Sequence, residues 1–304
     1  MKITVTGATG LVGSQLVAEL LTRGDEVTVL SRDPGRARST LGDVEAFAWA
    51  DPSAGPAPVE ALAGRDGVLH LLGEPVAQRW SPDVKRRIRQ SRELGTSNLV
   101  EGLRTADPRP RVLVSSSATG WYGPHGDEEL DETAPPARGD FLADVVVAWE
   151  AEAAKAEELG MRVAMLRTGM VVSESGGALE KMLPAFKLGV GGPVAGGHQY
   201  VPWVHVDDVV GAFLFCLDND SASGPMNATA PEPVTNAELS KTLGKVLHRP
   251  AFAPVPGLAV KALYGEMAEI VTTGQRAIPR RLTHLGYEWR QPELERALRS
   301  ATGS

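Results

Sequence analysis

The sequence predicts an α/β fold, a doubly wound parallel sheet that is followed by a smaller, helix-rich lobe. Two observations lead to this fold class. Residues 1–33 read as strand, glycine turn, helix and strand, and further short apolar strands alternate with helices up to residue 172. From residue 173 onward the chain changes to glycine-rich loops and helices. This is the Rossmann type of arrangement, in which ligands bind beyond the carboxyl ends of the strands.

The opening unit contains a glycine turn in the position of a phosphate-binding loop. A β-branched strand at residues 2–6 runs into a Gly-x-x-Gly-x-x-Gly turn, and a helix and a second strand at residues 26–30 follow. In such a turn the glycines permit the tight bend, the approach of a pyrophosphate to the backbone and the close packing of helix on strand. The alternative is an ordinary strand-to-helix turn. We expect dinucleotide binding through Gly7, Thr9, Gly10, Leu11, Val12 and Gly13.

The end of the second strand indicates which dinucleotide binds. NAD sites usually carry an acidic residue there, which binds the ribose 2′-hydroxyl, whereas this chain has Ser31 and Arg32. A guanidinium can form a forked, charge-assisted contact with a 2′-phosphate, and Arg36 and Arg38 add to the positive field. We therefore predict NADP(H) rather than NAD(H). The alternative is that Arg32 is a solvated loop charge, partly cancelled by Asp33.

Composition and charge exclude several classes of protein. The chain has 304 residues with 42% hydrophobic and 23% charged residues, which is typical of one large or two closely packed globular domains. The net charge of −7 argues against nucleic acid or an anionic membrane as the main partner. No apolar run reaches the roughly 18 residues of a transmembrane helix. Because the N-terminus enters the first strand directly, we expect no signal peptide. Because Cys216 is the only cysteine, no intrachain disulfide can form, and we expect a cytoplasmic protein.

The remaining elements follow from the same kinds of pattern. Apolar runs predict strands, and capping and turn residues mark the helix ends. We expect strands at residues 44–50, 66–72, 111–115, 161–172, 201–206 and 225–229, of which 201–206 returns to the central sheet. We expect helices at residues 59–62, 81–104, 143–158, 179–188 and 209–217. Asp207 and Asp208 are expected to cap the last of these, and Thr235 with Glu238 forms a capping box that opens a further helix.

The long helix at residues 81–104 is basic but does not indicate a nucleic-acid site. Ser81 and Pro82 begin it as N-cap and first helical residue. It carries Lys85, Arg86, Arg87, Arg89 and Arg92. A basic run without interleaved aromatic residues is usually a solvated helix face, so we expect no nucleic-acid partner. His70 lies in an apolar run and is expected in the core, and no histidine has metal-like partner spacing, so we expect no metal.

Four segments resemble the motifs of extended short-chain dehydrogenases/reductases, the group that includes sugar-nucleotide epimerases and dehydratases. These segments are residues 6–13, 95–99, 115–123 and 203–208. A narrower resemblance, to an epimerase-like subfamily of unsettled substrate, rests on residues 73–76, 91–92, 140–143, 149–150, 189–193 and 247–250. The resemblance covers essentially the whole chain.

The resemblance implies a catalytic set of Ser or Thr, Tyr and Lys. In that set the Ser polarises the reacting oxygen, the Tyr transfers a proton, and the Lys lowers the pKa of the Tyr, because a free Tyr is a poor base at neutral pH. Ser117 matches the Ser position, but no tyrosine lies between Tyr122 and Tyr200, so the Tyr-x-x-x-Lys pair is absent. Arg92 stands where many relatives have Asn.

Three consequences of this departure stay open. Tyr122 takes the acid/base role, or Arg92 supplies the positive charge of the missing Lys, or the protein binds NADPH and catalyses little. The structural alternatives are that Tyr122 only lines the pocket and that Ser117 only satisfies backbone groups at a strand end.

The position of strand ends and the resemblance together extend the predicted cofactor site. We expect further contacts from Asp51, Leu71, Leu72, Gly73, Ser115, Ser116, Arg167 and Met170. The resemblance implies an NADP-binding Rossmann domain of residues 1–172 plus 201–219. It assigns residues 173–200 and 220–304 to a substrate-binding lobe.

The first functional hypothesis is an NADP(H)-dependent oxidoreductase or epimerase that acts on a small polar carbonyl or hydroxyl compound. The second is an NADPH-binding sensor or partner protein with little catalysis, which the missing Tyr-x-x-x-Lys pair favours. A third hypothesis, a nucleic-acid or cell-division partner, is supported only by the basic helix. The sequence leaves a homodimer open.

Overall fold

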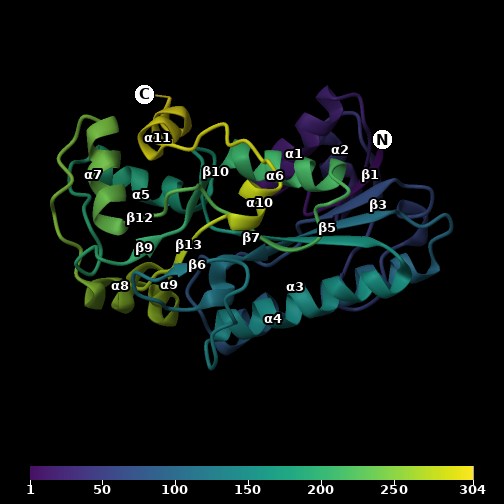
Figure 1. The fold of residues 1–304 in the computed structure, drawn as a ribbon, viewed down its shortest axis with the longest axis horizontal. Coiled ribbons are helices and arrows are strands. Elements are labelled where there is room, and N and C mark those ends of the chain that lie inside the picture. The colour runs from purple at the N-terminus through teal and green to yellow at the C-terminus, as the bar shows by residue number, and fades with distance from the viewer. Residues whose placement is uncertain (304) are drawn as a thin grey trace.

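A computed structural model describes residues 1–303 and confirms the predicted Rossmann-type architecture. At its centre lies a seven-stranded parallel sheet with the strand order β11-β7-β5-β4-β1-β2-β3 (Figure 1). These strands are β1 (Lys2–Thr6), β2 (Glu26–Ser31), β3 (Glu45–Ala48), β4 (Gly67–His70), β5 (Val112–Ala118), β7 (Arg162–Thr168) and β11 (Gly224–Ala228). Because all seven are parallel, their carboxyl ends meet along one edge of the sheet.

Helices cover both faces of this sheet, as Figure 1 shows. One face carries α1 (Leu11–Thr22), α2 (Pro34–Leu41) and α6 (Val206–Asp218). The opposite face carries α3 (Pro82–Thr105) and α4 (Phe141–Ala154), with the short 3-10 segments η1 (Val59–Ala61), η2 (Thr119–Tyr122) and η3 (Lys155–Leu159) nearby. The apolar face of α1 is buried, since Leu16, Val17 and Leu20 pack in the core together with Phe213 of α6.

The rest of the chain forms a lobe beside one end of the sheet (Figure 1). Its helices are α5 (Gly177–Lys187), α7 (Asn236–Val246), α8 (Gly257–Tyr264), α9 (Glu269–Thr272) and α11 (Leu294–Thr302), with the 3-10 segment η4 (Gly265–Ala268). The short helix α10 (Arg280–His284) instead packs against the central sheet, where Leu282 joins the core that contains Met226 of β11. Three small sheets pair β8 (Met170–Val172) with β10 (Trp203–His205), β9 (Tyr200–Val201) with β12 (Val234–Thr235), and β6 (Glu129–Leu130) with β13 (Arg276–Ala277). Within residues 1–303, no helix combines the length and the apolar character needed to cross a bilayer.

The strands around residues 161–228 differ from the sequence expectation. The predicted strand 161–172 is divided at Gly169, where a Cβ atom would lie 1.9 Å from the carbonyl oxygen of Pro202. The chain therefore crosses another backbone there, and β8 leaves the central sheet to pair with β10. Residues 201–206 thus do not return to the central sheet. The seventh strand is instead β11, from a segment expected in the lobe.

Two of the three predicted helix caps are confirmed. Ser81 caps α3 by accepting the N–H of Val84, and the capping box of Thr235 and Glu238 is present at α7. The prediction that Asp207 and Asp208 cap a helix at residues 209–217 was wrong, because α6 begins at Val206, with His205 as its N-cap. The buried carboxylate of Asp208 instead accepts the backbone N–H groups of Arg290 and Gln291, at 2.6 and 3.0 Å, and so ties the C-terminal segment to the Rossmann domain.

His70 lies in the core, as the sequence predicts. Its ring is fully buried between two hydroxyls, with Nδ1 2.7 Å from Thr6 Oγ1 and Nε2 3.0 Å from Thr96 Oγ1. Both partners can satisfy a neutral ring, and no carboxylate among residues 1–303 forms an ion pair with it. Burial lowers the pKa of His70 to about 3.

This burial predicts a pH-dependent stability. In the unfolded chain His70 takes up a proton below about pH 6.5, whereas the folded chain excludes that proton until about pH 3. Stability is therefore full above the unfolded pKa and is lost as the pH falls, by up to about 1.4 kcal/mol per pH unit. Urea unfolding at a series of pH values in this range measures the effect. The free energy of unfolding should fall more steeply with decreasing pH in the wild type than in His70→Gln. Equal slopes would show that His70 does not contribute.

Candidate active site

The predicted cofactor residues meet at the carboxyl edge of the sheet. Strand β1 lies between β4 and β2, and Thr6 is the register partner of both His70 and Leu30. The glycine turn after β1 is therefore flanked by residues 71–73 on one side and by Ser31 on the other. Leu72 and Pro52 both approach Gly95 of α3, which brings the loop that contains Asp51 to the same edge.

Two of the three glycines in the turn, Gly7 and Gly13, leave no room for a side chain. Gly7 has a φ of +66°, and a Cβ there would lie 2.4 Å from the carbonyl oxygen of Leu71. A Cβ at Gly13 would lie 2.3 Å from the carbonyl oxygen of Gly7, because α1 packs directly on the turn. Gly10 is exposed at the start of α1, and no side chain among residues 1–303 caps that helix. Its uncapped N–H groups fit a pyrophosphate.

The segment after β2 presents Arg32 without an intramolecular partner. Ser31 Oγ accepts the N–H of Asp33 at 3.1 Å, and the Asp33 carboxylate accepts the N–H of Arg36 at 3.0 Å as the N-cap of α2. Asp33 is thus engaged by backbone and does not form an ion pair with Arg32. The Arg32 side chain is exposed, and it has no hydrogen bond or ion pair within residues 1–303. These features fit a 2′-phosphate.

The other predicted cofactor residues differ in how freely they face a ligand. Gly73 and Asp51 are exposed, although Asp51 Oδ1 already accepts the N–H of Ser53 at 2.9 Å. Ser115 is fully buried, and its hydroxyl donates to the carbonyl oxygen of Ser116. The half-buried residues of the predicted set at this edge are Leu11, Val12, Leu71, Leu72, Ser116 and Met170.

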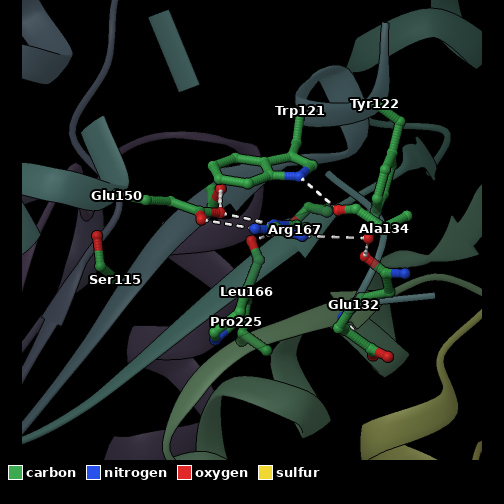
Figure 2. A network of polar contacts seen from close by, with 12 residues as sticks. Ser115, Trp121, Tyr122, Glu132, Ala134, Glu150, Leu166, Arg167 and Pro225 are labelled. Atoms are coloured by element: carbon green, nitrogen blue, oxygen red, sulfur yellow. Dashed lines mark hydrogen bonds and ion pairs between the residues drawn. The ribbon is translucent and has the colours of Figure 1, made fainter. Parts of the chain in front are cut away.

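A buried polar network lies just behind this edge (Figure 2). Ser117, Arg167 and Asn227 are register partners on β5, β7 and β11, so they form one row across the sheet. Glu150 reaches this row from α4. Its carboxylate accepts Arg167 Nε and Nη2, both at 2.8 Å, and Oε1 also accepts the Ser117 hydroxyl at 2.5 Å.

Tyr122 belongs to the same network. Its side chain is fully buried, and its hydroxyl lies 2.8 Å from Asn227 Oδ1 and 3.1 Å from the carbonyl oxygen of Asp131. Arg167 Nη1 donates to it at 3.3 Å, and the guanidinium stacks on the ring of Trp121 at 3.8 Å (Figure 2). Burial raises the pKa of Tyr122, against the opposing effect of Arg167. A proton-transferring tyrosine needs the opposite shift, so this placement favours a supporting role.

The network continues into the lobe through Asn227 and Glu132. Asn227 donates its Nδ2 to the carbonyl oxygen of Ile278 at 2.9 Å and its backbone N–H to Glu132 at 2.9 Å. Glu132 also accepts the N–H of Arg281 at 3.2 Å, and burial raises its pKa. Glu132, the last residue of an acidic run at residues 128–132, therefore joins β11 to the segment that contains Arg281.

Glu150 and Asn227 are not among the site residues predicted from the sequence. A signal for Glu150 exists, since Ala143, Val146 and Glu150 share one face of α4, and a carboxylate on an apolar helix face requires a buried partner. Arg167, within a buried strand, is that partner. Among residues 1–303, no three His, Cys, Asp or Glu side chains are grouped to hold a metal ion.

Comparisons with known proteins extend over the whole chain. The NAD dependent epimerase/dehydratase family matches residues 3–228, and a domain of unknown function, DUF1731, matches residues 255–301. The epimerase family protein SDR39U1 homolog, chloroplastic, of Arabidopsis thaliana is 40% identical over 304 residues, which cover 99% of this chain and 86% of that protein.

Two solved structures are similar in both sequence and fold. The crystal structure of human epimerase family protein SDR39U1 (isoform 2) with NADPH has a TM-score of 0.88 and 32% identity and covers both chains completely. The nucleoside-diphosphate sugar epimerase from Corynebacterium glutamicum has a TM-score of 0.78 and 34% identity over all of this chain and 58% of that one.

Proposed function

Because the chain belongs to the NAD dependent epimerase/dehydratase family, we propose that it binds NADP(H) and transfers hydride to or from a small polar carbonyl or hydroxyl compound. The observation that carries this proposal is the pairing of an uncapped glycine turn with a free cation at the end of β2. The turn fits a pyrophosphate, and Arg32 fits a 2′-phosphate. The human relative that was solved with NADPH supports the same choice of dinucleotide.

Ser117 and Glu150 provide the proton chemistry in this proposal. A bound nicotinamide supplies or accepts the hydride. The Ser117 hydroxyl donates to Glu150 Oε1, so its oxygen offers lone pairs to an incoming hydroxyl group. When a substrate alcohol is oxidised, its proton moves to Ser117 Oγ while the Ser117 proton moves to Glu150. Reduction of a carbonyl reverses both transfers, and Arg167 holds the carboxylate in place throughout.

Tyr122 acts as a positioning residue in this arrangement. Its hydroxyl fixes Asn227 and receives one N–H of Arg167, which in turn orients Glu150. The helix that carries Tyr and Lys in typical members of the family reads Phe-Leu-Ala-Asp-Val-Val-Val-Ala-Trp-Glu at residues 141–150, so it offers neither group.

The second candidate function is an NADPH-binding sensor or partner protein with little catalysis. The absence of Tyr and Lys from α4, together with the burial of the Tyr122 hydroxyl, favours it. NADPH oxidation with a panel of small carbonyl compounds separates the two candidates. Turnover that disappears in Ser117→Ala supports the enzyme, whereas a protein that binds NADPH but reduces no member of a broad panel supports the sensor.

The dinucleotide preference is the first testable outcome. We expect NADPH to bind at least tenfold more tightly than NADH in calorimetric titrations, because a charge-assisted pair contributes about 1.5–3 kcal/mol. Arg32→Ala should weaken NADPH binding by about tenfold and leave NADH binding unchanged. Arg104→Ala, which removes an exposed cation distant from the strand end, serves as the control. Equal affinities for the two dinucleotides would contradict the predicted role of Arg32, and no binding of either would overturn the proposed function.

A further inference from the structure

Arg92 differs from the other arginines of α3 in having no carboxylate partner. Arg86, Arg87, Arg89 and Arg104 form ion pairs with Asp83, Glu74, Glu93 and Glu101, respectively. These arginines are exposed or nearly so, where an ion pair contributes little to stability. Arg92 is half-buried, its guanidinium is desolvated, and among residues 1–303 no acidic group lies within ion-pair distance of it, so that Glu74 acts on it only at longer range. The guanidinium of Arg92 is therefore a desolvated charge without an ion-pair partner, which is a costly arrangement.

The guanidinium of Arg92 is held in one orientation with one side free. Within residues 1–303, only Nη1 has hydrogen-bond partners, the carbonyl oxygens of Glu74 at 3.0 Å and Ile88 at 3.2 Å. The group lies 5.1 Å from the ring of Trp149, and Gly73 leaves room for it, since a Cβ there would lie 3.0 Å from Arg92 Cζ. Nε and Nη2 have no hydrogen-bond partner within the described chain. These two nitrogens form the edge that binds a carboxylate or phosphate bidentately.

The free edge of Arg92 lies at the same end of the sheet as the proposed reacting groups. Gly73 follows β4 at the carboxyl edge of the sheet, and Trp149 precedes Glu150, which binds Ser117. Burial lowers the pKa of Arg92 to about 10, and a bound anion would offset the same desolvation. We propose that Arg92 binds an anionic group, a carboxylate or a phosphate, of the substrate. This inference rests on the proposed function and narrows its substrate class to acidic carbonyl or hydroxyl compounds.

Calorimetric titration of the NADP⁺-saturated protein with oxalate and with inorganic phosphate tests the proposal. We expect at least one of these anions to bind the wild type and to bind Arg92→Met at least tenfold more weakly. Arg92→Lys should retain part of the affinity, because it keeps the charge but loses the fork. Arg89→Met removes an equal charge from the exposed side of the same helix and should bind the anion like the wild type. A change in oxalate affinity without a change in phosphate affinity would assign the site to carboxylates, and the reverse would assign it to phosphates.

NADPH affinity, measured on the same variants, separates the ways in which the proposal can fail. Unchanged NADPH binding in Arg92→Met shows that the variant is folded. If the wild type binds neither anion, or if Arg92→Met binds them equally well, the substrate-anion site is overturned while the cofactor site stands. If Arg92→Met loses NADPH affinity and keeps the anion, Arg92 serves the cofactor and the proposal is wrong. If no dinucleotide binds the wild type, the proposed function fails, and the same anion titrations without NADP⁺ still decide the role of Arg92.

Discussion

Arg167→Met should destabilise the protein by about 3–5 kcal/mol, because it leaves a buried carboxylate without its cation. Arg167 is 1% exposed, and its side chain is the only one within residues 1–303 that forms an ion pair with Glu150. The same substitution removes the stacking contact with Trp121 and one hydrogen bond to Tyr122. Urea denaturation followed by circular dichroism measures the loss as a shift of the unfolding midpoint.

Two further variants identify the cause of this loss. Arg104→Met breaks an exposed ion pair with Glu101 and should change the free energy of unfolding by less than about 1 kcal/mol. The double variant Arg167→Met with Glu150→Leu removes both charges and should recover a large part of the stability, since a hydrophobic pair can replace a buried ion pair. If Arg167→Met is no more harmful than Arg104→Met, or if the double variant is worse than the single one, the buried charge is not the cause.

Much of the fold follows from local patterns in the sequence. The alternation of strands and helices, the capping residues Ser81 and Thr235 and the apolar stripe of α1 all lie within a few residues of the structure that they specify. The error around residues 201–228 has a different origin. Periodicity indicates that a segment is a strand but does not say which strand it pairs with, so the exchange of β10 for β11 in the central sheet could not be deduced locally.

The candidate site also contains features that local sequence predicts and features that depend on how distant strands pair. The glycine turn and Arg32 can be interpreted from sequence because strand, turn and helix are consecutive. The network behind Ser117 cannot, since Tyr122 and Asn227 are 105 residues apart, and the strand pattern around Asn227 does not show that this strand pairs with β7. Glu150 is intermediate, because helical spacing places it on the apolar face of α4 but only the sheet register supplies Arg167 as its partner.

Substitutions of the glycines in the turn should separate effects on NADPH binding from effects on folding. Gly10→Ala should weaken NADPH binding by about tenfold to a hundredfold, which is about 1.4–2.8 kcal/mol. Gly10 is exposed, and a Cβ there would approach only the carbonyl oxygen of Gly7, at 3.2 Å, so the free energy of unfolding should change by no more than about 1 kcal/mol. Calorimetry and urea unfolding measure the two effects independently.

Gly13→Ala should instead act on the fold, because its Cβ would lie 2.3 Å from a backbone oxygen that cannot move without displacing the turn. Gly126→Ala is the neutral control, since no atom of the described chain lies within 4 Å of the added Cβ and the residue has no positive φ. Full NADPH affinity in Gly10→Ala would mean that the phosphates do not approach this part of the backbone. The turn would then serve only the packing of α1 on the sheet. Arg32 would have no phosphate-binding turn beside it, and the proposed dinucleotide site would lose its support.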